Sequence, residues 1–178
     1  MKTLSVIIPT LNEEAYIATT LQLATLPHVE CIVVDGGSSD QTVDIAKNLG
    51  ARVVHAPLGR ARQMNAGAAE TKTKTLLFLH ADTLPPTNFP KIIDATLNQP
   101  KTAGGAFAFK LSETNLRLQM IEFFTNLRAE LFQLPHGNQG LFIRKHLFDE
   151  MCVFREHRSW RTISLCAACA DSATSASR

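Results

Sequence analysis

Two short apolar runs in this chain end on acidic turn segments. Residues 31–34 read Cys-Ile-Val-Val and lead into Asp35, and residues 76–79 read Leu-Leu-Phe-Leu and lead into His80-Ala81-Asp82. A short, uninterrupted run of bulky or β-branched residues is typical of a strand buried on both faces in a parallel sheet. Because ligands bind at the carboxyl ends of such strands, the two acids are predicted to lie at one ligand-binding edge.

Predicted strands and helices alternate along the first hundred residues. Pro9 is expected to end the first strand, Asn12 to cap the helix after it, and Asp40 to cap the next helix. Strands are predicted at 4–8, 31–34, 52–55, 75–79, 106–109 and 141–143, and helices after Asn12, at 42–49, at 61–70, after Pro90 and at 116–132. Before the strand at 106–109, a Gly-Gly pair lets backbones approach closely. The pattern predicts an α/β fold with a doubly wound, mostly parallel sheet flanked by helices.

The composition restricts the class of protein. With 178 residues and 45% hydrophobic content, the chain can bury one sizeable core. Its 18 Lys and Arg against 16 Asp and Glu give a net charge of +2, too weak a bias to indicate a nucleic acid partner. Apolar stretches fall far short of the roughly 18 residues that a membrane span needs. Pro9 and Asn12 interrupt the apolar start too early for a signal peptide, so the expected location is the cytoplasm.

The two strand-end acids can together bind a sugar nucleotide. Asp35 is predicted to point into the crevice and accept the N3 proton of uracil or another base edge, although it could merely start a turn. Asp82 is the best metal candidate, because a hard Mg²⁺ or Mn²⁺ neutralises a leaving diphosphate through carboxylate oxygens. His80 suits Mn²⁺ better than Mg²⁺, or it contacts the ribose instead. An ordinary Asp-Thr turn is the alternative for Asp82.

A basic helix start lies between these acids. Arg60, Arg62 and Asn65 surround the beginning of the predicted third helix. Backbone N–H groups and guanidinium forks there favour a phosphate or a base carbonyl. A solvated basic helix face is an equally weighted alternative.

Cysteine usage indicates no disulfide framework, because the four cysteines are unevenly spaced. Cys31 is expected to be a buried, inert thiol in a core strand. Cys166 and Cys169 have the spacing of a redox or zinc half-site, but no second pair completes a zinc site.

Four segments resemble, in order, the family-2 inverting glycosyltransferases of the GT-A fold. They are residues 6–14, 33–42, 59–67 and 78–83. More narrowly, they resemble the small bacterial members labelled "transferase 2, radical-SAM/selenodomain-associated", over roughly residues 1 to 155. Four weak to moderate motifs in register form a strong signal.

The resemblance implies a Rossmann-like GT-A fold and a UDP- or GDP-type nucleotide-diphosphosugar donor with Mg²⁺ or Mn²⁺. Asp82 becomes the last acid of a DxD-type metal motif, and His80 stands where many members carry the first Asp. The implied nucleotide-sugar-binding residues are Pro9, Thr10, Asn12, Glu13, Asp35, Arg60, Arg62, Asn65, His80 and Ala81.

The acceptor side is implied by a weaker likeness. Gly105 and a segment containing His136, Asn138 and Gln139 correspond to residues that border the acceptor, with Asn138 where an acid often stands. The acceptor itself is not predicted, and neither is the oligomeric state. A lipid acceptor would bring peripheral membrane association.

The general base expected of the family is missing. An inverting transfer needs a base on the acceptor hydroxyl, and in the family it is the Asp of a Glu-Asp pair before an Arg-rich helix. The only acidic residues after residue 150 are Glu156 and Asp171, and neither matches that motif. No catalytic residue is therefore assigned.

The composition of the last twenty residues indicates why the Glu-Asp pair is missing. They are rich in small residues and lack core periodicity. In another reading frame, allowed codons for 159–161 give Met-Glu-Asp, and those for 166–173 give Arg-Arg-Leu-Arg-Arg-Phe-Gly. We hypothesise a one-base deletion, or an equivalent shift, between about Met151 and Ser159, which makes the Cys166/Cys169 pair an accident of translation. The predicted organisation is a domain at 1–158, with a nucleotide half to about residue 100 and an incomplete acceptor half at 101–158, and a disordered tail at 159–178.

Two other classes of protein compete with an impaired glycosyltransferase. A non-catalytic sugar-nucleotide-binding module would also lack the base. A sugar-phosphate nucleotidyltransferase shares the sheet architecture but should carry a Gly-rich loop with Arg and Lys after the first strand, and residues 9–14 lack it.

Overall fold

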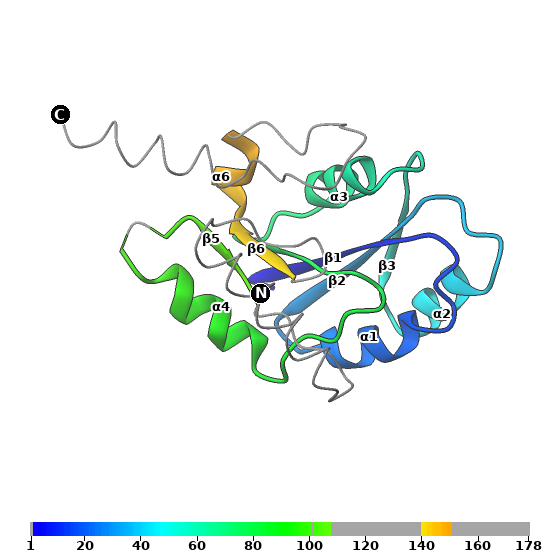
Figure 1. The fold of residues 1–178 in the computed structure, drawn as a ribbon, viewed down its shortest axis with the longest axis horizontal. Coiled ribbons are helices and arrows are strands. Elements are labelled where there is room, and N and C mark those ends of the chain that lie inside the picture. Colours follow the sequence, from blue (N-terminus) through cyan, green and yellow to red (C-terminus); the bar gives the residue numbers. More distant parts are fainter. Residues whose placement is uncertain (1, 101, 108–139, 151–178) are drawn as a thin grey trace, which may run out of the picture.

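The computed structural model describes residues 2–100, 102–107 and 140–150. These residues form a six-stranded sheet in the order β3-β2-β1-β4-β6-β5 (Figure 1). The strands are β1 Leu4–Thr10, β2 Val29–Asp35, β3 Arg52–His55, β4 Thr75–Phe78, β5 Gly104–Ala106 and β6 Leu141–Arg144. The first four are parallel, whereas β6 is antiparallel to both β4 and β5. The predicted α/β fold with a mostly parallel sheet is confirmed.

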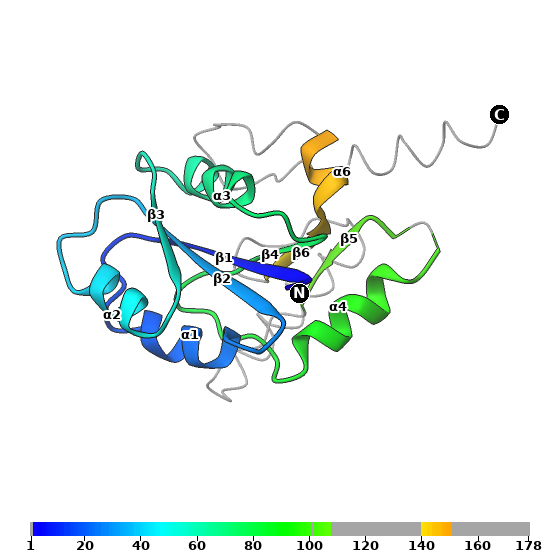
Figure 2. The same cartoon turned by 180° about the vertical axis from the view of Figure 1, so that it is seen from behind.

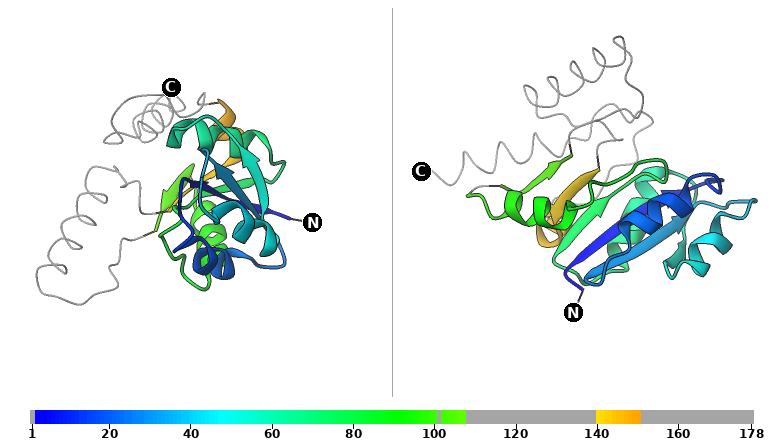
Figure 3. Two further views of the ribbon diagram at one scale, coloured as in Figure 1. Left: turned by 90° about the vertical axis from the view of Figure 1, so that its right-hand side faces the viewer. Right: turned by 90° about the horizontal axis from the view of Figure 1, so that it is seen from below.

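Helices cover both faces of the sheet, as Figures 1 and 2 show. They are α1 Ile17–Ala24, α2 Thr42–Asn48, α3 Arg60–Ala69, α4 Phe89–Leu97 and α6 Lys145–Glu150. α1, α2 and α4 share one buried apolar cluster, while α3 and α6 share another on the opposite face. Along β1, Val6 and Ile8 belong to the first cluster and Ile7 to the second, because successive side chains of a strand point to opposite faces. Figure 3 shows this layered arrangement from two further sides.

β1 continues through Pro9, so the prediction that this proline ends the strand is wrong. Pro9 pairs in register with Val34 of β2 and is buried. Ile7 faces β4, where its carbonyl accepts the Leu79 N–H at 3.0 Å, and Pro9 faces the same side two residues later. Because β4 has ended by that point, the missing proline N–H leaves no ladder bond unmade.

Asn12 does not cap α1, which begins at Ile17 and has Tyr16 at its N-cap position. Asn12 instead has a φ of 55°, in the left-handed region that asparagine tolerates better than most residues. The predicted capping role of Asp40 is closer to what the structure shows. Its Oδ1 accepts the Thr42 N–H at 3.0 Å at the start of α2, although the N-cap position itself is Gln41.

Close approach at the predicted glycine pair is confirmed. A Cβ on Gly105 would lie 2.6 Å from Cζ of Phe142 in β6, and one on Gly104 would lie 2.6 Å from the Phe142 carbonyl oxygen. The strand there begins at Gly104, two residues earlier than predicted. The predicted helix at 116–132 and the cysteines of the tail lie outside the described residues, whereas Cys31 is buried as predicted. Within the described ranges, no helix has the length and apolar character to cross a bilayer.

Candidate functional site

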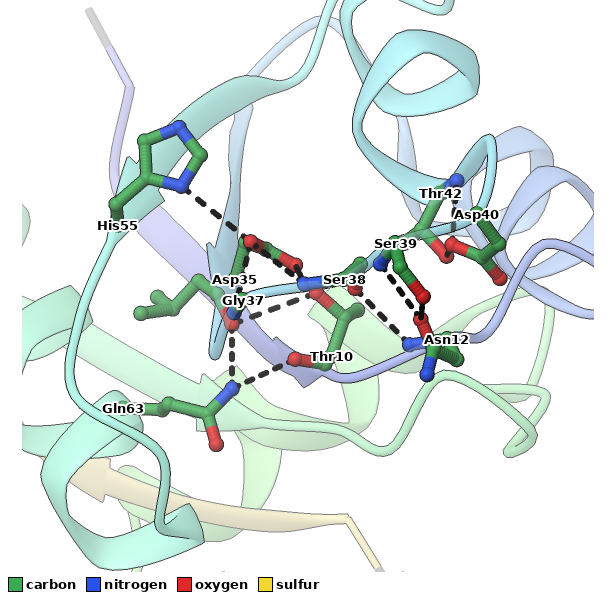
Figure 4. Close-up of polar contacts among 11 residues, drawn as sticks. Thr10, Asn12, Asp35, Gly37, Ser38, Ser39, Asp40, Thr42, His55 and Gln63 are labelled. Carbon is green, nitrogen blue, oxygen red and sulfur yellow. Dashed lines mark hydrogen bonds and ion pairs between the residues drawn. The ribbon is translucent and has the colours of Figure 1, made fainter.

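Three polar side chains lie in one row at the carboxyl edge of the sheet. The last residues of β1, β2 and β3 are in register, so Thr10, Asp35 and His55 are neighbours across the strands. Figure 4 shows them side by side, with His55 Nδ1 3.3 Å from Asp35 Oδ2. His55 was not among the residues singled out from the sequence, because only the pairing of β3 with β2 places it beside Asp35.

The loops after β1 and β2 are bonded to each other. The Asn12 N–H donates to Ser38 Oγ at 2.9 Å, and Asn12 Oδ1 accepts the Ser39 N–H at 2.8 Å (Figure 4). A few residues on, the Glu14 N–H donates to Asp40 Oδ2 at 3.1 Å, and Glu14 Oε2 accepts the Gln41 N–H at the same distance. These reciprocal contacts make one structural unit of two loops that are about 25 residues apart in sequence.

Asp35 is almost fully buried, with 2% of its surface exposed. Its carboxylate accepts the Gly37 N–H at 3.0 Å and the Ser38 N–H at 3.1 and 3.2 Å. Burial by itself raises the pKa of this carboxyl group, but the hydrogen bonds from Ser38, Gly37 and His55 outweigh it and bring the pKa below its ordinary value. Gly37 has a φ of 104°, which lets its N–H turn back onto the carboxylate. The ionised Asp35 therefore holds its own turn in shape, and its carboxylate lies at the row of strand ends.

The basic segment begins α3, as predicted. Gly59, with a φ of 137°, precedes the helix, and Arg60 and Arg62 are exposed in its first turn, while Asn65 is half-buried. α3 packs closely on β1 and β2 through Gly67, where a Cβ would lie 2.5 Å from Ile7 Cγ2 and 2.9 Å from Val34 Cγ2. The bonds of Gln63 to the Thr10 and Val34 carbonyls place the helix start at the same edge of the sheet as the two bonded loops.

Gln63 is the second site residue that sequence reasoning missed. It is 2% exposed, and its Nε2 donates to the carbonyl oxygens of Thr10 and Val34, each at 2.8 Å (Figure 4). A signal was available, because a glutamine between two candidate binding residues on the inward face of a helix needs polar partners. Which partners it takes could not be predicted before the packing of α3 was known.

The turn after β4 presents Asp82 to solvent. The Thr83 N–H donates to the His80 carbonyl at 3.1 Å, which places Ala81 and Asp82 at the centre of a tight turn. His80 is buried at 7% exposure and Ala81 at 2%, whereas Asp82 is exposed. Thr20 of α1 donates to the Ala81 carbonyl at 2.5 Å and anchors this turn to the helix.

Glu13 links this turn to the bonded loops electrostatically. Partial burial and the nearby carboxylates of Asp82 and Asp40 raise the pKa of Glu13, and Arg60 counteracts them. Acids from the loops after β2 and β4 and the first arginine of α3 therefore lie near enough to Glu13 to act on it at a single edge.

The carboxylates suit a hard divalent cation that also binds a ligand. Among the residues that the structure describes, no group of three or more His, Cys, Asp or Glu side chains is placed to hold a metal ion. Mg²⁺ usually takes one or two protein carboxylates together with phosphate oxygens of its substrate, so an exposed Asp82 with Glu13 nearby fits such an ion. His80 offers less, because an imidazole suits a hard cation less well than a carboxylate does.

The structure places the predicted acceptor residues only in part. Gly105 lies in β5 and contacts Phe142 of β6. These two strands form the edge of the sheet next to β4. His136, Asn138 and Gln139 lie outside the described residues.

Comparison with known proteins identifies the family. The model of Glycosyl transferase family 2 matches residues 5–155, and the chain belongs to this family. Over 91 residues the chain is 34% identical to a 4,4'-diaponeurosporenoate glycosyltransferase of Staphylococcus haemolyticus. This match covers 46% of this chain and 24% of that protein. Over 88 residues it is 41% identical to a PGL/p-HBAD biosynthesis glycosyltransferase of Mycobacterium bovis, and this match covers 44% of this chain and 34% of that protein. The matches thus span about a quarter to a third of these relatives.

Solved structures confirm the GT-A glycosyltransferase fold. A glucosyl-3-phosphoglycerate synthase of Mycobacterium tuberculosis, in complex with Mn²⁺, UDP and glucosyl-3-phosphoglycerate, aligns with a TM-score of 0.63 at 23% identity, over 83% of this chain and 58% of that one. A mannosyltransferase of Pyrobaculum calidifontis, in complex with GDP-Man and Mn²⁺, aligns with a TM-score of 0.68 at 20% identity, over 85% and 47%. At these identities the likeness establishes the fold.

Proposed function

We propose that this chain binds a nucleotide-diphosphosugar of the UDP or GDP type at the carboxyl edge of β1, β2 and β4, and that it descends from inverting glycosyltransferases. One observation carries the proposal. The loops after β1 and β2, the first turn of α3 and the Asp82 turn lie at one edge of a doubly wound sheet, which is where such sheets bind ligands. The UDP and GDP-Man complexes among proteins of this fold support the choice of ligand.

The two bonded loops form the nucleoside part of the proposed site. Asp35 at the end of β2 receives the base, and it is ionised because its hydrogen bonds lower its pKa. Thr10 pairs in register with Asp35, and Pro9, Thr10 and Asn12 are the other residues of the proposed nucleoside part. The exposed Arg60 and Arg62 supply guanidinium groups for the diphosphate. Asn65, His80 and Ala81 complete the proposed donor site.

Asp82 would hold the Mg²⁺ or Mn²⁺, since it is the exposed carboxylate of the β4 turn. When bound, such an ion neutralises charge that develops on a leaving diphosphate. Glu13 contributes negative charge beside it, and a cation shared with the phosphates would relieve the repulsion that raises the Glu13 pKa.

Transfer by this chain is proposed to be impaired. Inversion requires a base aligned on the acceptor hydroxyl, opposite the leaving group, and the sequence after residue 150 contains no Glu-Asp pair. Sequencing the coding DNA tests the reading-frame hypothesis, because codons incompatible with Met-Glu-Asp at 159–161 would end it. The acceptor is left open, and a lipid acceptor would bring peripheral membrane association.

The absence of the Glu-Asp pair also favours a second candidate function, that of a non-catalytic sugar-nucleotide-binding module. Calorimetric titration with UDP- and GDP-sugars in Mn²⁺, followed by hydrolysis and transfer assays, separates the two. Donor binding without turnover supports the module, whereas robust sugar transfer would refute the loss of the base. Absence of any nucleotide binding would refute both.

The metal assignment is tested by Asp82→Ala. We expect this variant to lose Mn²⁺-dependent nucleotide affinity and to unfold within about 0.5 kcal/mol of the parent, because an exposed turn acid contributes little to the core. Asp94→Ala is the matched control, since Asp94 is an exposed acid of α4. If Mn²⁺ still strengthens nucleotide binding by Asp82→Ala, another group holds the ion.

A further inference from the structure

Gln63 joins three of the four segments of the proposed donor site, all but the Asp82 turn. Its Nε2 carries two N–H groups and donates to the carbonyls of Thr10 and Val34, the residues that directly precede the loop after β1 and Asp35. Gln63 itself lies in α3, three residues after Arg60. One buried amide therefore connects the helix of the basic residues to both strands that carry the nucleoside loops.

The fold satisfies these two carbonyls without Gln63. The Thr10 carbonyl also accepts the Gly36 N–H at 3.0 Å, and the Val34 carbonyl accepts the Thr10 hydroxyl at 3.4 Å. Losing the amide would leave neither carbonyl without a donor, so the stability cost should be small. What would be lost is a link of defined length between α3 and the two strand ends.

The turn after β2 leaves room for this amide. A Cβ on Gly36 would lie 3.0 Å from Gln63 Nε2 and 3.2 Å from its Cδ, closer than side chains ordinarily pack. Gly36 has no positive φ that would call for glycine. A Cβ there would also lie 3.3 Å from Leu58 Cδ1, so Gln63 and Leu58 together limit the space at this position.

We infer that Gln63 is a positioning residue that aligns the diphosphate-binding start of α3 with the nucleoside-binding loops. The inference rests on the proposed function, because it assumes that one nucleotide spans both parts. A linked ligand gains affinity only when both halves of its site are held in register. A nucleoside or a pyrophosphate alone contacts one half and is insensitive to that register.

Gln63→Met tests this alignment, because methionine has a similar length and removes both N–H donors. The matched control is Gln22→Met, at an exposed glutamine of α1. Affinities for UDP, GDP, uridine, guanosine and Mn²⁺-pyrophosphate are measured by calorimetry and ligand-observed NMR. We expect the preferred diphosphate to bind at least about tenfold more weakly to Gln63→Met, with the separate fragments changed by less than about twofold.

Other outcomes distinguish the failures. A parent chain that binds neither UDP nor GDP overturns the proposed function and this inference together. Unchanged diphosphate affinity in Gln63→Met overturns the inference alone. Equal losses for the diphosphate and the fragments show that Gln63 only supports the fold, and they also overturn it.

A second variant covers the case in which Gln63→Met does not fold. Gly36→Ala keeps Gln63 but places a methyl group 3.0 Å from its Nε2 and 3.3 Å from Leu58 Cδ1, so the amide has to shift by a few tenths of an ångström to accommodate it. The same selective loss of diphosphate affinity is expected, and a Gly36→Ala chain that binds UDP or GDP like the parent overturns the inference.

Discussion

Replacing Asp35 by asparagine separates its structural role from its role in binding. The change keeps the size of the side chain but removes the charge and turns one acceptor oxygen into a donor. In the structure that carboxylate accepts N–H groups from Gly37 and Ser38 and lies 3.3 Å from His55 Nδ1. Because asparagine keeps only one acceptor oxygen, both the turn and any base contact should weaken.

The size of the effect follows from these contacts. Hydrogen bonds to a charged group contribute about 1.5–3 kcal/mol and neutral ones about 0.5–1.5 kcal/mol, so converting two of them costs about 1–3 kcal/mol. The His55 contact adds little, because that imidazole is 68% exposed. At roughly 2–4 °C per kcal/mol for a chain of this size, the melting temperature at pH 7 should fall by about 2–12 °C.

The stabilisation contributed by Asp35 should depend on pH in one direction. Hydrogen bonding holds the pKa of Asp35 below its ordinary value of 3.8, so its stabilisation is fully present above that pH and is lost as pH falls through the folded value. The difference in melting temperature between the parent and Asp35→Asn should therefore shrink below about pH 4.

The assay combines thermal unfolding from pH 7 to pH 3 with calorimetric titration of UDP and GDP. Asp94→Asn, at an exposed acid of α4, is the control for loss of a charge. A lower melting temperature with parental nucleotide affinity would show that Asp35 only shapes its turn. An unchanged melting temperature at pH 7 would refute the energetic reasoning itself.

Two further substitutions test how the site is assembled. Gly67→Ala should destabilise the chain by about 1–3 kcal/mol in chemical denaturation, because its Cβ would lie 2.5 Å from Ile7 Cγ2; parental stability would mean that α3 can move away from the sheet at no cost. Asn12→Gly and Asn12→Ala both remove the acceptor of the Ser39 N–H, but only alanine is strained at a φ of 55°, so Asn12→Ala should be the less stable by about 1 kcal/mol. Equal stability of the two Asn12 variants in thermal unfolding would contradict a left-handed Asn12.

Local patterns were sufficient to predict most of the fold. The apolar runs that end at Asp35 and near Asp82 identified two of the parallel strands, and the strand at 52–55 was predicted with its observed bounds. Such runs are reliable because burial on both faces of a parallel sheet demands continuous bulky residues. The four motifs also predicted the family, which the match over residues 5–155 confirms.

Errors arose where a residue's partner is distant in sequence. Pro9 was expected to end a strand, but it continues because β4 has already stopped on the side that its nitrogen faces. Asn12 was expected to cap the helix that follows it, but it bonds to the loop after β2 instead. Local propensity describes what a residue can do alone, whereas these outcomes depend on which neighbour the sheet places beside it.

The sequence therefore defined which residue types were available for chemistry, and the tertiary structure decided how they are held. Asp35, Arg60 and Asp82 could be selected as candidates because they stand at predicted strand ends and at a predicted helix start, where doubly wound sheets bind ligands. Gln63 contacts the Thr10 and Val34 carbonyls, and His55 lies beside Asp35; both contacts arise only from helix packing and strand register. Hydrogen bonds are short-ranged and directional, so no pattern along the chain could indicate these contacts before the fold had brought the residues together.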